Sequence, residues 1–271
     1  MRELAVLIAV HNAQDALIRT LQSLDRQACD FDVFVADDCS TPPIAINPSA
    51  FHHRIQLVRL TSNQGPFAAA NEGLRQIMQS DYKFVARQDA GDLDVDGRLA
   101  SQVAFLKAHP DVALVGAWVR FVDAAGKPLF LFQPPADARG IRRRMQYSSA
   151  IIHPACMMRL DALRKIGLYS EQYRLDRGGF VGGDYELFFR LANSFECANI
   201  PEFLVIKEES PGISVSIDKR RQSVLSRMRT QLRYFDLFSP HSYAGLLCSC
   251  MMYVIPYGVW TKIKSRLRVV T

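Results

Sequence analysis

Four aspartates crowd the end of a predicted strand in the segment FVARQDAGDLDVDGRL. The apolar residues 84–86 lead directly into the four side chains, which are Asp89, Asp92, Asp94 and Asp96. Carboxylates this close together repel one another and are costly to bury unless a cation joins them. The segment is therefore either a solvated loop or a loop that holds a metal ion.

Two further acidic features adjoin predicted elements. Asp37 and Asp38 end an apolar run, and Asp184 opens a helical pattern in VGGDYELFFRL. Ligands of open parallel sheets bind outside the carboxyl ends of the strands. These acids also have structural alternatives. Asp37 and Asp38 suit a turn. Asp184, and Asp96 of the first segment, suit the N-caps of the helices that follow them. Three acidic features at one end of a single sheet favour a shared site.

Apolar runs and helical patterns alternate along the first 110 residues. The run ELAVLIAV, at residues 3–10, predicts a strand buried on both faces. Further strands are predicted at 30–38, 54–60 and 82–89, with helices at 13–27, 65–79 and 97–109. This alternation predicts an α/β fold, in which a mostly parallel sheet is flanked by helices.

The pattern changes after residue 110. Strands at hairpin spacing are predicted at 111–123, 127–133 and 155–160, with Gly126 and Lys127 in the first turn. These strands extend the sheet and make it mixed. Helices are expected near 161–166, 184–193 and 218–238. We expect one domain over residues 1–217 and a C-terminal helical extension over 218–271.

Composition limits the classes of partner. The chain has 271 residues, 49% of them apolar, so it can bury a full core. Its six cysteines form no Cys-x-x-Cys pair, which argues against structural zinc and favours a reducing cytosol. Residues 218–271 hold ten Lys and Arg and two Asp, or +8, so the remainder of the +6 chain carries −2. Basicity confined to the tail argues against a nucleic-acid partner and favours an anionic membrane surface.

The tail contains an uncharged stretch, Tyr243 to Trp260, followed by the basic and apolar sequence TKIKSRLRVV. A proline and a glycine interrupt the stretch, and a spanning helix needs about 20 apolar residues. We expect the segment to lie in a membrane interface, with Tyr253, Tyr257 and Trp260 at headgroup level. A core helix with a basic end is the alternative. Since the N-terminus does not read as a secretory signal, we expect a cytoplasmic protein, peripheral at the inner face of the cell membrane.

Several segments, read in order, match one family. They are VLIAVHNAQDALIRTLQSLDRQ, DVFVADDCS, NQGPFAAANEGLR, ARQDAGDLDVDGRLASQVAFLKAHPDVALVG, IIHPACMMRLDALRKIGLYSEQYR and GGDYELFFRLA. From about Leu4 to Gln222, the chain resembles the family 2 inverting glycosyltransferases of the GT-A fold. The resemblance implies a Rossmann-like mixed sheet, with a nucleotide-binding half at about 1–110 and an acceptor-side half at about 111–217.

The resemblance also implies a nucleotide pocket at the carboxyl ends of the first strands. The residues that match it are Ala9, His11, Asp37, Asp38, Asn63 and Asn71. Asp38 would accept hydrogen bonds from the nucleotide base. Asn63 and Asn71 lie in the segment of the nucleotide-side helix, where Asn-Gln-Gly also suits an ordinary loop and N-cap.

The loop from Asp89 to Asp92 occupies the place of the family's metal-binding Asp-x-Asp loop. The resemblance implies that Asp92 coordinates Mg²⁺ or Mn²⁺, which would stabilise the charge of a leaving diphosphate. Asp184 matches the general base, and His153 lies in a segment that lines the site. One base and direct displacement would invert the anomeric centre. A retaining route through a protein nucleophile remains an alternative.

Two positions depart from the family pattern. Gly91 stands where the metal loop usually has an acid, and Gly183 stands where another acid often precedes the base. Neither change removes the metal ligand or the base. Arg87 has two interpretations, because it would either contact the diphosphate or form an ion pair with Asp89.

The leading hypothesis is an enzyme that transfers a single sugar from a nucleotide-diphosphate-sugar to a saccharide or lipid-linked saccharide acceptor, in cell-surface polysaccharide biosynthesis. The Gln-x-x-Arg-Trp sequence of processive polymerases is absent. One alternative is a sugar-phosphate nucleotidyltransferase, although AVHNAQDAL lacks a Gly-rich basic loop. The other is a non-catalytic, membrane-bound nucleotide-sugar-binding or scaffold protein with a degenerate site, for which Gly91 is the best support.

Overall fold

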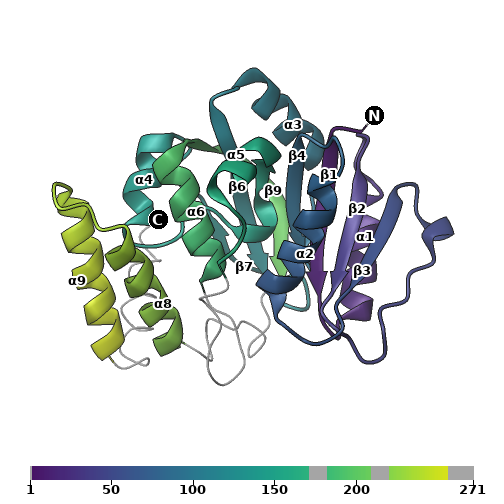
Figure 1. The fold of residues 1–271 in the computed structure, drawn as a ribbon, viewed down its shortest axis with the longest axis horizontal. Helices are drawn as coiled ribbons and strands as arrows, with labels where there is room; N and C mark the ends of the chain where they lie inside the picture. The colour runs from purple at the N-terminus through teal and green to yellow at the C-terminus, as the bar shows by residue number, and fades with distance from the viewer. Residues whose placement is uncertain (1, 171–181, 209–219, 256–271) are drawn as a thin grey trace.

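The computed structural model describes residues 2–170, 182–208 and 220–255. Within them, nine strands form one sheet in the order β3-β2-β1-β4-β8-β6-β9-β5, with β7 paired to β6 (Figure 1). The strands are β1 (Leu4–Val10), β2 (Asp32–Asp37), β3 (Arg54–Arg59), β4 (Phe84–Asp89), β5 (Leu93–Asp94), β6 (Val112–Val122), β7 (Pro128–Phe132), β8 (Met157–Arg159) and β9 (Glu196–Glu208). The α-helices are α1 (Gln14–Leu24), α2 (Pro66–Met78), α3 (Arg98–Ala108), α4 (Ala138–Met145), α5 (Leu160–Ile166), α6 (Gly183–Ser194), α8 (Arg220–Arg233) and α9 (Pro240–Val254).

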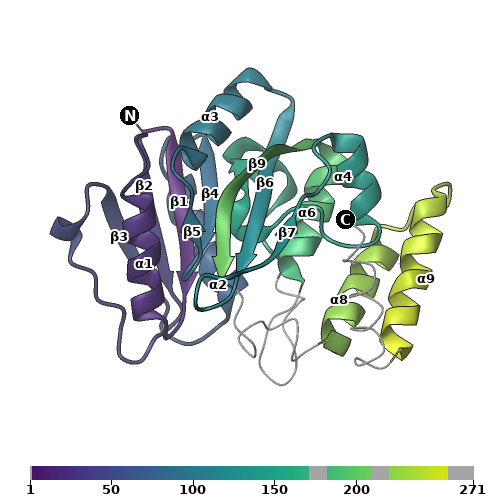
Figure 2. The same ribbon diagram turned by 180° about the vertical axis from the view of Figure 1, so that it is seen from behind.

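The first strand is buried on both faces, as its apolar run predicts. Leu4, Val6 and Ile8 pack in one core with residues of α1 and α3. Ala5 and Leu7 pack in a second core with residues of α2. Because successive side chains of a strand point to opposite faces, a strand covered by helices on both sides needs a continuous apolar run. The two views of the ribbon show these helices in front of and behind the sheet (Figures 1 and 2).

The predicted mixed, mostly parallel sheet is confirmed. β1 pairs in parallel with β2 and β4, β2 pairs in parallel with β3, and β6 pairs in parallel with β9. β8 is antiparallel to both β4 and β6, and β7 returns antiparallel to β6. Gly126 lies in the predicted turn between β6 and β7 with a φ of +79°, a conformation that favours glycine.

The longest strand, β9, is not predicted from the sequence. Pro201 lies in its interior, and proline argues against a central strand because it has no N–H to donate. The register with β6 shifts at this point: Ala117 faces Ile200, and the next residue of β6, Trp118, faces Phe203. Pro201 and its neighbour are thereby left outside the ladder, as in a β-bulge. Beyond the irregularity, β9 pairs with the two-residue strand β5.

The C-terminal extension contains α8, within the predicted range 218–238, and α9. Tyr234 of α8 stacks on Phe189 of α6 with ring centroids 5.4 Å apart. Gln231 donates from Nε2 to the carbonyl oxygen of Gln146, after α4, at 2.6 Å. In the described part of the chain, no helix is long and apolar enough to cross a bilayer. Tyr257, Trp260 and the basic residues that follow lie outside the described residues.

The alternative predictions that Asp96 and Asp184 are helix N-caps are wrong. The N-cap residue of α3 is Gly97, while Asp96 lies exposed with an oxygen 3.5 Å from Nε of Arg26. The N-cap residue of α6 is Gly182, and Asp184 lies in the first turn of that helix. Both N-cap glycines have positive φ, so backbone conformation selects the cap residue at these two helices.

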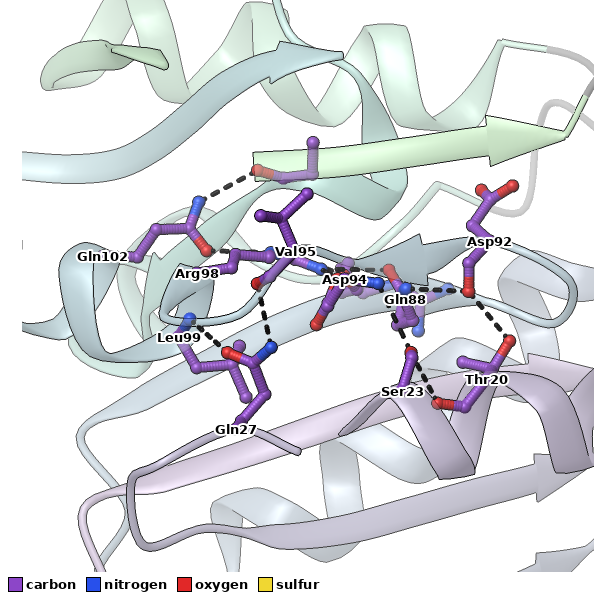
Figure 3. A network of polar contacts seen from close by, with 12 residues as sticks. Thr20, Ser23, Gln27, Gln88, Asp92, Asp94, Val95, Arg98, Leu99 and Gln102 are labelled. Carbon is purple, nitrogen blue, oxygen red and sulfur yellow. Dashed lines mark hydrogen bonds and ion pairs between the residues drawn. The ribbon is translucent and has the colours of Figure 1, made fainter. Parts of the chain in front are cut away.

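A buried ion pair fixes the loop that follows β4 (Figure 3). The side chains of Asp94 and Arg98 are both inaccessible to solvent and form a salt bridge. Arg98 also donates to Gln88 Oε1 at 3.0 Å and to the carbonyl oxygen of Arg87 at 2.9 Å. From α1, Ser23 Oγ accepts the backbone N–H of Asp94 at 3.3 Å. The loop is thus held by contacts to β4, α1 and α3.

The start of α6 is packed too closely to carry a side chain at Gly183. A Cβ atom there would lie 2.7 Å from two ring atoms of Phe67 in α2. The Phe67 ring is in turn stacked on Tyr169, with centroids 5.4 Å apart. The absence of an acid before Asp184 therefore has a steric reason.

We expect Arg98→Met to destabilise the fold by about 3–5 kcal/mol, because it leaves the buried Asp94 carboxylate without its cation. The free energy of unfolding from urea denaturation measures the effect. The matched control is Arg26→Met, which breaks the exposed pair with Asp96 and should cost less than about 1 kcal/mol. Equal losses in the two variants would contradict a structural role for the buried pair.

We expect Gly183→Ala to lower the melting temperature although alanine is the better helix former. Helix propensity alone would stabilise by about 1 kcal/mol, whereas overpacking against Phe67 costs about 1–3 kcal/mol. In a Phe67→Leu background the ring atoms are gone, so the same substitution should be neutral or stabilising. A double-mutant cycle of unfolding free energies tests this, and additive effects would refute the contact.

Candidate active site

The carboxyl ends of β1, β2 and β4 lie side by side at one edge of the sheet. In the parallel registers, Val10 of β1 pairs with Asp37 of β2, and Ala9 pairs with Asp89 of β4. Asp37 and Asp89 therefore flank the end of β1. Parallel pairing brings together acidic residues that lie 52 positions apart in the sequence.

Asp37 has a structural role at this edge. Its fully buried carboxylate accepts from Arg59 Nη1 at 2.7 Å and from the backbone N–H of Ser40 at 2.9 Å. The second contact is the turn role weighed as an alternative for this residue. Asp37 thereby fixes the chain between β2 and the following loop.

Asp38, His11 and Asn63 form one cluster after the ends of β1 and β2. The Asp38 carboxylate accepts the backbone N–H groups of Gln64 and Gly65 at 2.7 Å each, and so holds the loop before α2. The Asp38 carbonyl oxygen lies 2.8 Å from Nδ1 of His11, which must donate because a carbonyl only accepts. Nε2 of the neutral ring then accepts the Asn63 amide at 3.0 Å. Contacts of this cluster with a nucleotide stay predictions.

The loop from Asp89 to Asp92 is clamped by Thr20 of α1. Thr20 Oγ1 accepts the backbone N–H of Gly91 at 2.9 Å. It also donates to the carbonyl oxygen of Asp92 at 2.9 Å (Figure 3). Gly91 has a φ of +103°, which side chains rarely adopt. The loop conformation therefore explains why glycine replaces an acid at this position.

Lys207 lies between the two carboxylates of the loop. Its Nζ is 2.7 Å from Asp92 Oδ2 and 3.9 Å from Asp89 Oδ2. The lysine follows directly on the pairing of β9 with β5, in which Ile206 faces Leu93. The unpredicted strand β9 thus delivers the cation that joins the acids.

Behind Asp89 lies a buried cluster of Arg87, His153 and Tyr169. His153 Nε2 lies 3.2 Å from Arg87 Nε and 2.7 Å from the Tyr169 hydroxyl. An arginine nitrogen only donates, so Nε2 accepts and Nδ1 carries the proton. That Nδ1 and Arg87 Nη2 each lie 3.6 Å from Asp89 Oδ1. Arg87 is 1% exposed, which supports its ion-pair interpretation over contact with a diphosphate.

Asn71 has a structural role next to the predicted nucleotide pocket, and its contact with a nucleotide stays a prediction. It is buried in the core, where its Nδ2 donates to the carbonyl oxygen of Tyr169 and its Oδ1 accepts the Tyr169 N–H, both at 2.9 Å. Both ends of the amide are therefore used. Asn71 fixes the backbone of Tyr169, whose hydroxyl contacts His153, and the family resemblance that implied a nucleotide contact does not reveal this role.

Asp184 is half-buried and lies in the first turn of α6. Phe188 of that helix lies 6.0 Å from the His153 ring, centroid to centroid. Burial raises the pKa of the Tyr169 hydroxyl, and the charges of Asp184 and Asp89 add to the rise. Gly183, the residue before Asp184, packs against Phe67, and the Phe67 ring stacks on Tyr169, so the start of α6 lies near the Tyr169 and His153 cluster.

The pKa values of the Asp89 and Asp92 carboxyl groups are shifted in opposite directions. Burial acts to raise the pKa of Asp89, but His153, Lys207 and Arg87 outweigh it and hold this pKa well below its usual range. Burial raises the pKa of Asp92 to about 7, with the charge of Asp89 adding to the rise and Lys207 opposing it. Asp92 is therefore the carboxylate whose ionised form depends more on a neighbouring cation.

The chemistry of this pair fits a divalent cation. Asp89 and Asp92 supply hard oxygen donors and already share one positive group, the Lys207 ammonium. Across the described ranges, no group of three or more His, Cys, Asp and Glu side chains is arranged to hold a metal ion. Mg²⁺ needs no such group when one or two carboxylates act together with the phosphates of a substrate.

Three residues of the site have no clear signal in the sequence. Thr20 lies mid-helix, Tyr169 follows a short helix, and Lys207 belongs to an unpredicted strand. Each acts on the predicted acids through a contact between segments far apart in the chain, and Lys207 is 115 residues from Asp92. Tertiary contacts of this kind leave no local pattern.

Comparisons with known proteins identify relatives of this chain. A glycosyltransferase of Haemophilus influenzae is 26% identical over 243 residues, covering 88% of this chain and 84% of its own. The amylovoran biosynthesis glycosyltransferase AmsE of Erwinia amylovora is 26% identical and covers 74% of each chain. The succinoglycan biosynthesis protein ExoU of Rhizobium meliloti is 28% identical over 70% of this chain and 57% of its own.

Solved structures share the fold. TarS of S. aureus in complex with UDP-GlcNAc superimposes with a TM-score of 0.64 and 19% identity, covering 91% of this chain and 70% of its own. The mannosyltransferase PcManGT of Pyrobaculum calidifontis, in complex with GDP-Man and Mn²⁺, superimposes with a TM-score of 0.63 and 17% identity. The match covers 94% of this chain and 71% of that chain. These likenesses support the GT-A fold. The family model for glycosyl transferase family 2 matches residues 5–167, so the chain belongs to that family.

Proposed function

We propose that this glycosyltransferase moves a single sugar from a nucleotide-diphosphate-sugar to a saccharide or lipid-linked saccharide, with inversion, in cell-surface polysaccharide biosynthesis. The observation that carries the proposal is that Asp89 and Asp92 lie together at the carboxyl edge of the sheet, where both contact the Lys207 ammonium. The names of the Erwinia and Rhizobium relatives support the biosynthetic class. The nucleotide sugars bound to the similar structures support the donor class.

On the donor side, the nucleotide would lie against the ends of β1 and β2, near Ala9. His11 and Asn63 are exposed there and are held to each other by their hydrogen bond. Asp38 accepts two backbone N–H groups. A carboxylate has about four lone-pair sites, so Asp38 keeps the capacity to accept from a base as well.

Asp92, with Asp89 beside it, would hold Mg²⁺ or Mn²⁺. Bound there, the ion would supply positive charge to the leaving diphosphate. Lys207 reduces the repulsion between the two carboxylates, and Thr20 keeps their loop in one conformation. The chain's own residues thus organise the acidic loop.

Asp184 would act as general base. Its carboxylate takes the proton of the acceptor hydroxyl while that oxygen forms a bond to the anomeric carbon. The bond from that carbon to the diphosphate breaks on the opposite face, and a single displacement inverts the centre. Asp184 lies in the first turn of α6, and the preceding Gly183 packs against Phe67, which stacks on Tyr169; this position supports the role.

The two rival functions are weakened by specific observations. The degenerate-site alternative relied on Gly91, but a φ of +103° accounts for glycine there without loss of function. The nucleotidyltransferase alternative does not explain the family match over residues 5–167. Sugar transfer in the presence of Mn²⁺, surveyed over nucleotide sugars with saccharide acceptors, tests the enzyme directly. No transfer or donor hydrolysis with any of them would favour a binding protein.

The proposal includes two further features of the whole chain. Residues 1–217 would form the catalytic unit, and residues 218–271 would attach it peripherally to the inner face of the cell membrane. The formal charge of +8 on the extension supports attraction to anionic lipid. Such attachment would bring the site close to a lipid-linked acceptor.

We expect Asp184→Asn to lower turnover by roughly two to four orders of magnitude, the range for a lost general base. Asparagine is nearly isosteric, so the melting temperature and donor affinity should stay close to those of the wild type. Turnover is measured at saturating donor and acceptor, alongside a thermal melt. Full turnover in a folded Asp184→Asn protein would rule out the base as assigned and direct attention to His153 and Glu186.

We expect Asp92→Asn to weaken metal-dependent donor binding by roughly tenfold or more, about 1.4 kcal/mol, because an amide carries no charge for the cation. Thermal shift with nucleotide sugar, with and without Mn²⁺, gives the readout. Asp96→Asn is the matched control, since Asp96 is an exposed aspartate just after β5 and pairs only weakly with Arg26. Unchanged metal dependence in Asp92→Asn would reject the metal assignment.

A further inference from the structure

The last described helix, α9, exposes its large apolar side chains and buries its small ones. Its outward residues recur every three or four positions and so form one stripe; they are Tyr243, Leu247, Met251 and Val254, with exposed fractions of 53%, 61%, 46% and 76%. Its buried residues are Ser242, Gly245 and Ser249. Surface helices of globular proteins normally have the opposite arrangement.

Packing prevents α9 from turning its large side chains inward. A Cβ atom on Gly245 would lie 2.0 Å from the carbonyl oxygen of Gln146. Ser242 Oγ donates to Gln146 Oε1 at 3.2 Å, and Gln231 of α8 donates to the same Gln146 carbonyl oxygen. The small face of α9 is therefore required by this close approach, and the apolar stripe is left outside.

The stripe continues beyond the N-terminal end of α9. The Tyr243 hydroxyl donates to the carbonyl oxygen of Leu237 at 3.1 Å. This contact places the stripe next to the turn that holds Leu237 and Phe238, which are 69% and 96% exposed. At the other end, the Arg221 guanidinium lies 5.9 Å from the ring centroid of Tyr253. Figure 1 shows α9 at the outer edge of the molecule, beside α8.

The charges around the stripe identify what would cover it. Helix α8 contains five arginines and no acidic residue in RRQSVLSRMRTQLR, and residues 218–271 carry +8. A second copy of the chain would bring two such basic regions together, which electrostatic repulsion opposes. An apolar stripe next to arginines and tyrosines instead suits the headgroup region of an anionic bilayer. With 15 residues, α9 is too short to span the bilayer.

We propose that α9 docks along the surface of an anionic membrane through this stripe, extended by Leu237 and Phe238. The apolar side chains enter the headgroup boundary, and Arg221 reaches lipid phosphates at one end. The docking face therefore lies on the α8–α9 pair itself. This inference sharpens the proposed membrane attachment and does not rest on the sugar chemistry, so it can fail while sugar transfer stands.

The test is sedimentation of the full chain with vesicles of phosphatidylcholine alone and of phosphatidylcholine mixed with phosphatidylglycerol. We expect the wild type to bind the mixed vesicles more strongly, and less so as salt rises. The double variant Leu247→Gln with Met251→Gln should lower the partition coefficient by about tenfold or more, since two apolar side chains are lost from the membrane contact. Its melting temperature should not fall, because both side chains are exposed.

The matched control is Leu129→Gln with Leu131→Gln, which changes two leucines of β7 that are similarly exposed. It should partition as the wild type does. Three results would each overturn the proposal: equal binding to neutral and mixed vesicles, unchanged binding of the α9 variant, or equal losses in both double variants. A wild-type dimer that the α9 variant converts to monomer would also overturn it, by identifying the face as an interface between copies.

Discussion

Compensation of negative charge is the constraint on which the carboxyl edge of this sheet depends. Each acid that the chain gathers there has a partner. Arg59 pairs with Asp37, Arg98 with Asp94, and Lys207 with Asp92. Asp38 is balanced by backbone N–H groups. Because buried carboxylates without partners are strongly destabilising, these contacts allow an acidic site to exist in a stable fold.

Compensation also explains why the second half of the chain is needed for the site. The ladder of strand β9 skips Pro201, and the strand then pairs with β5, which brings Lys207 to the loop from Asp89 to Asp92. Helix α6 begins at Gly183, close against Phe67, and brings in Asp184. The proposed nucleotide-binding half alone would contain the acidic loop but not Lys207. The proposed base and the proposed metal ligand therefore depend on one folded unit.

The layout of the molecule relates the proposed chemistry to the proposed membrane contact. The strands β1 to β3 lie at one end of the ribbon and the α8–α9 pair at the other (Figure 1). Asp89, His153 and Asp184 belong to elements between these ends. An acceptor carried by lipid would approach from the side of the helix pair, whereas the proposed nucleotide site lies toward the opposite side. Docking through α9 would hold this orientation at the membrane surface.

Much of this was predictable from local sequence pattern. Apolar runs predict β1 and most of the parallel sheet, because a strand covered on both faces must be apolar throughout. The ordered motifs identify the family and the acids Asp38, Asp89, Asp92 and Asp184.

Tertiary structure decided the rest. Asn71 proved to be a core residue because its amide is spent on the Tyr169 backbone. Lys207 and Thr20 reach the loop only through long-range packing, and Gly91 and Gly183 are explained by φ and by a ring in another helix. The spacing of apolar residues indicates which face of a helix or strand a residue lies on. It does not indicate which distant side chain that residue will contact.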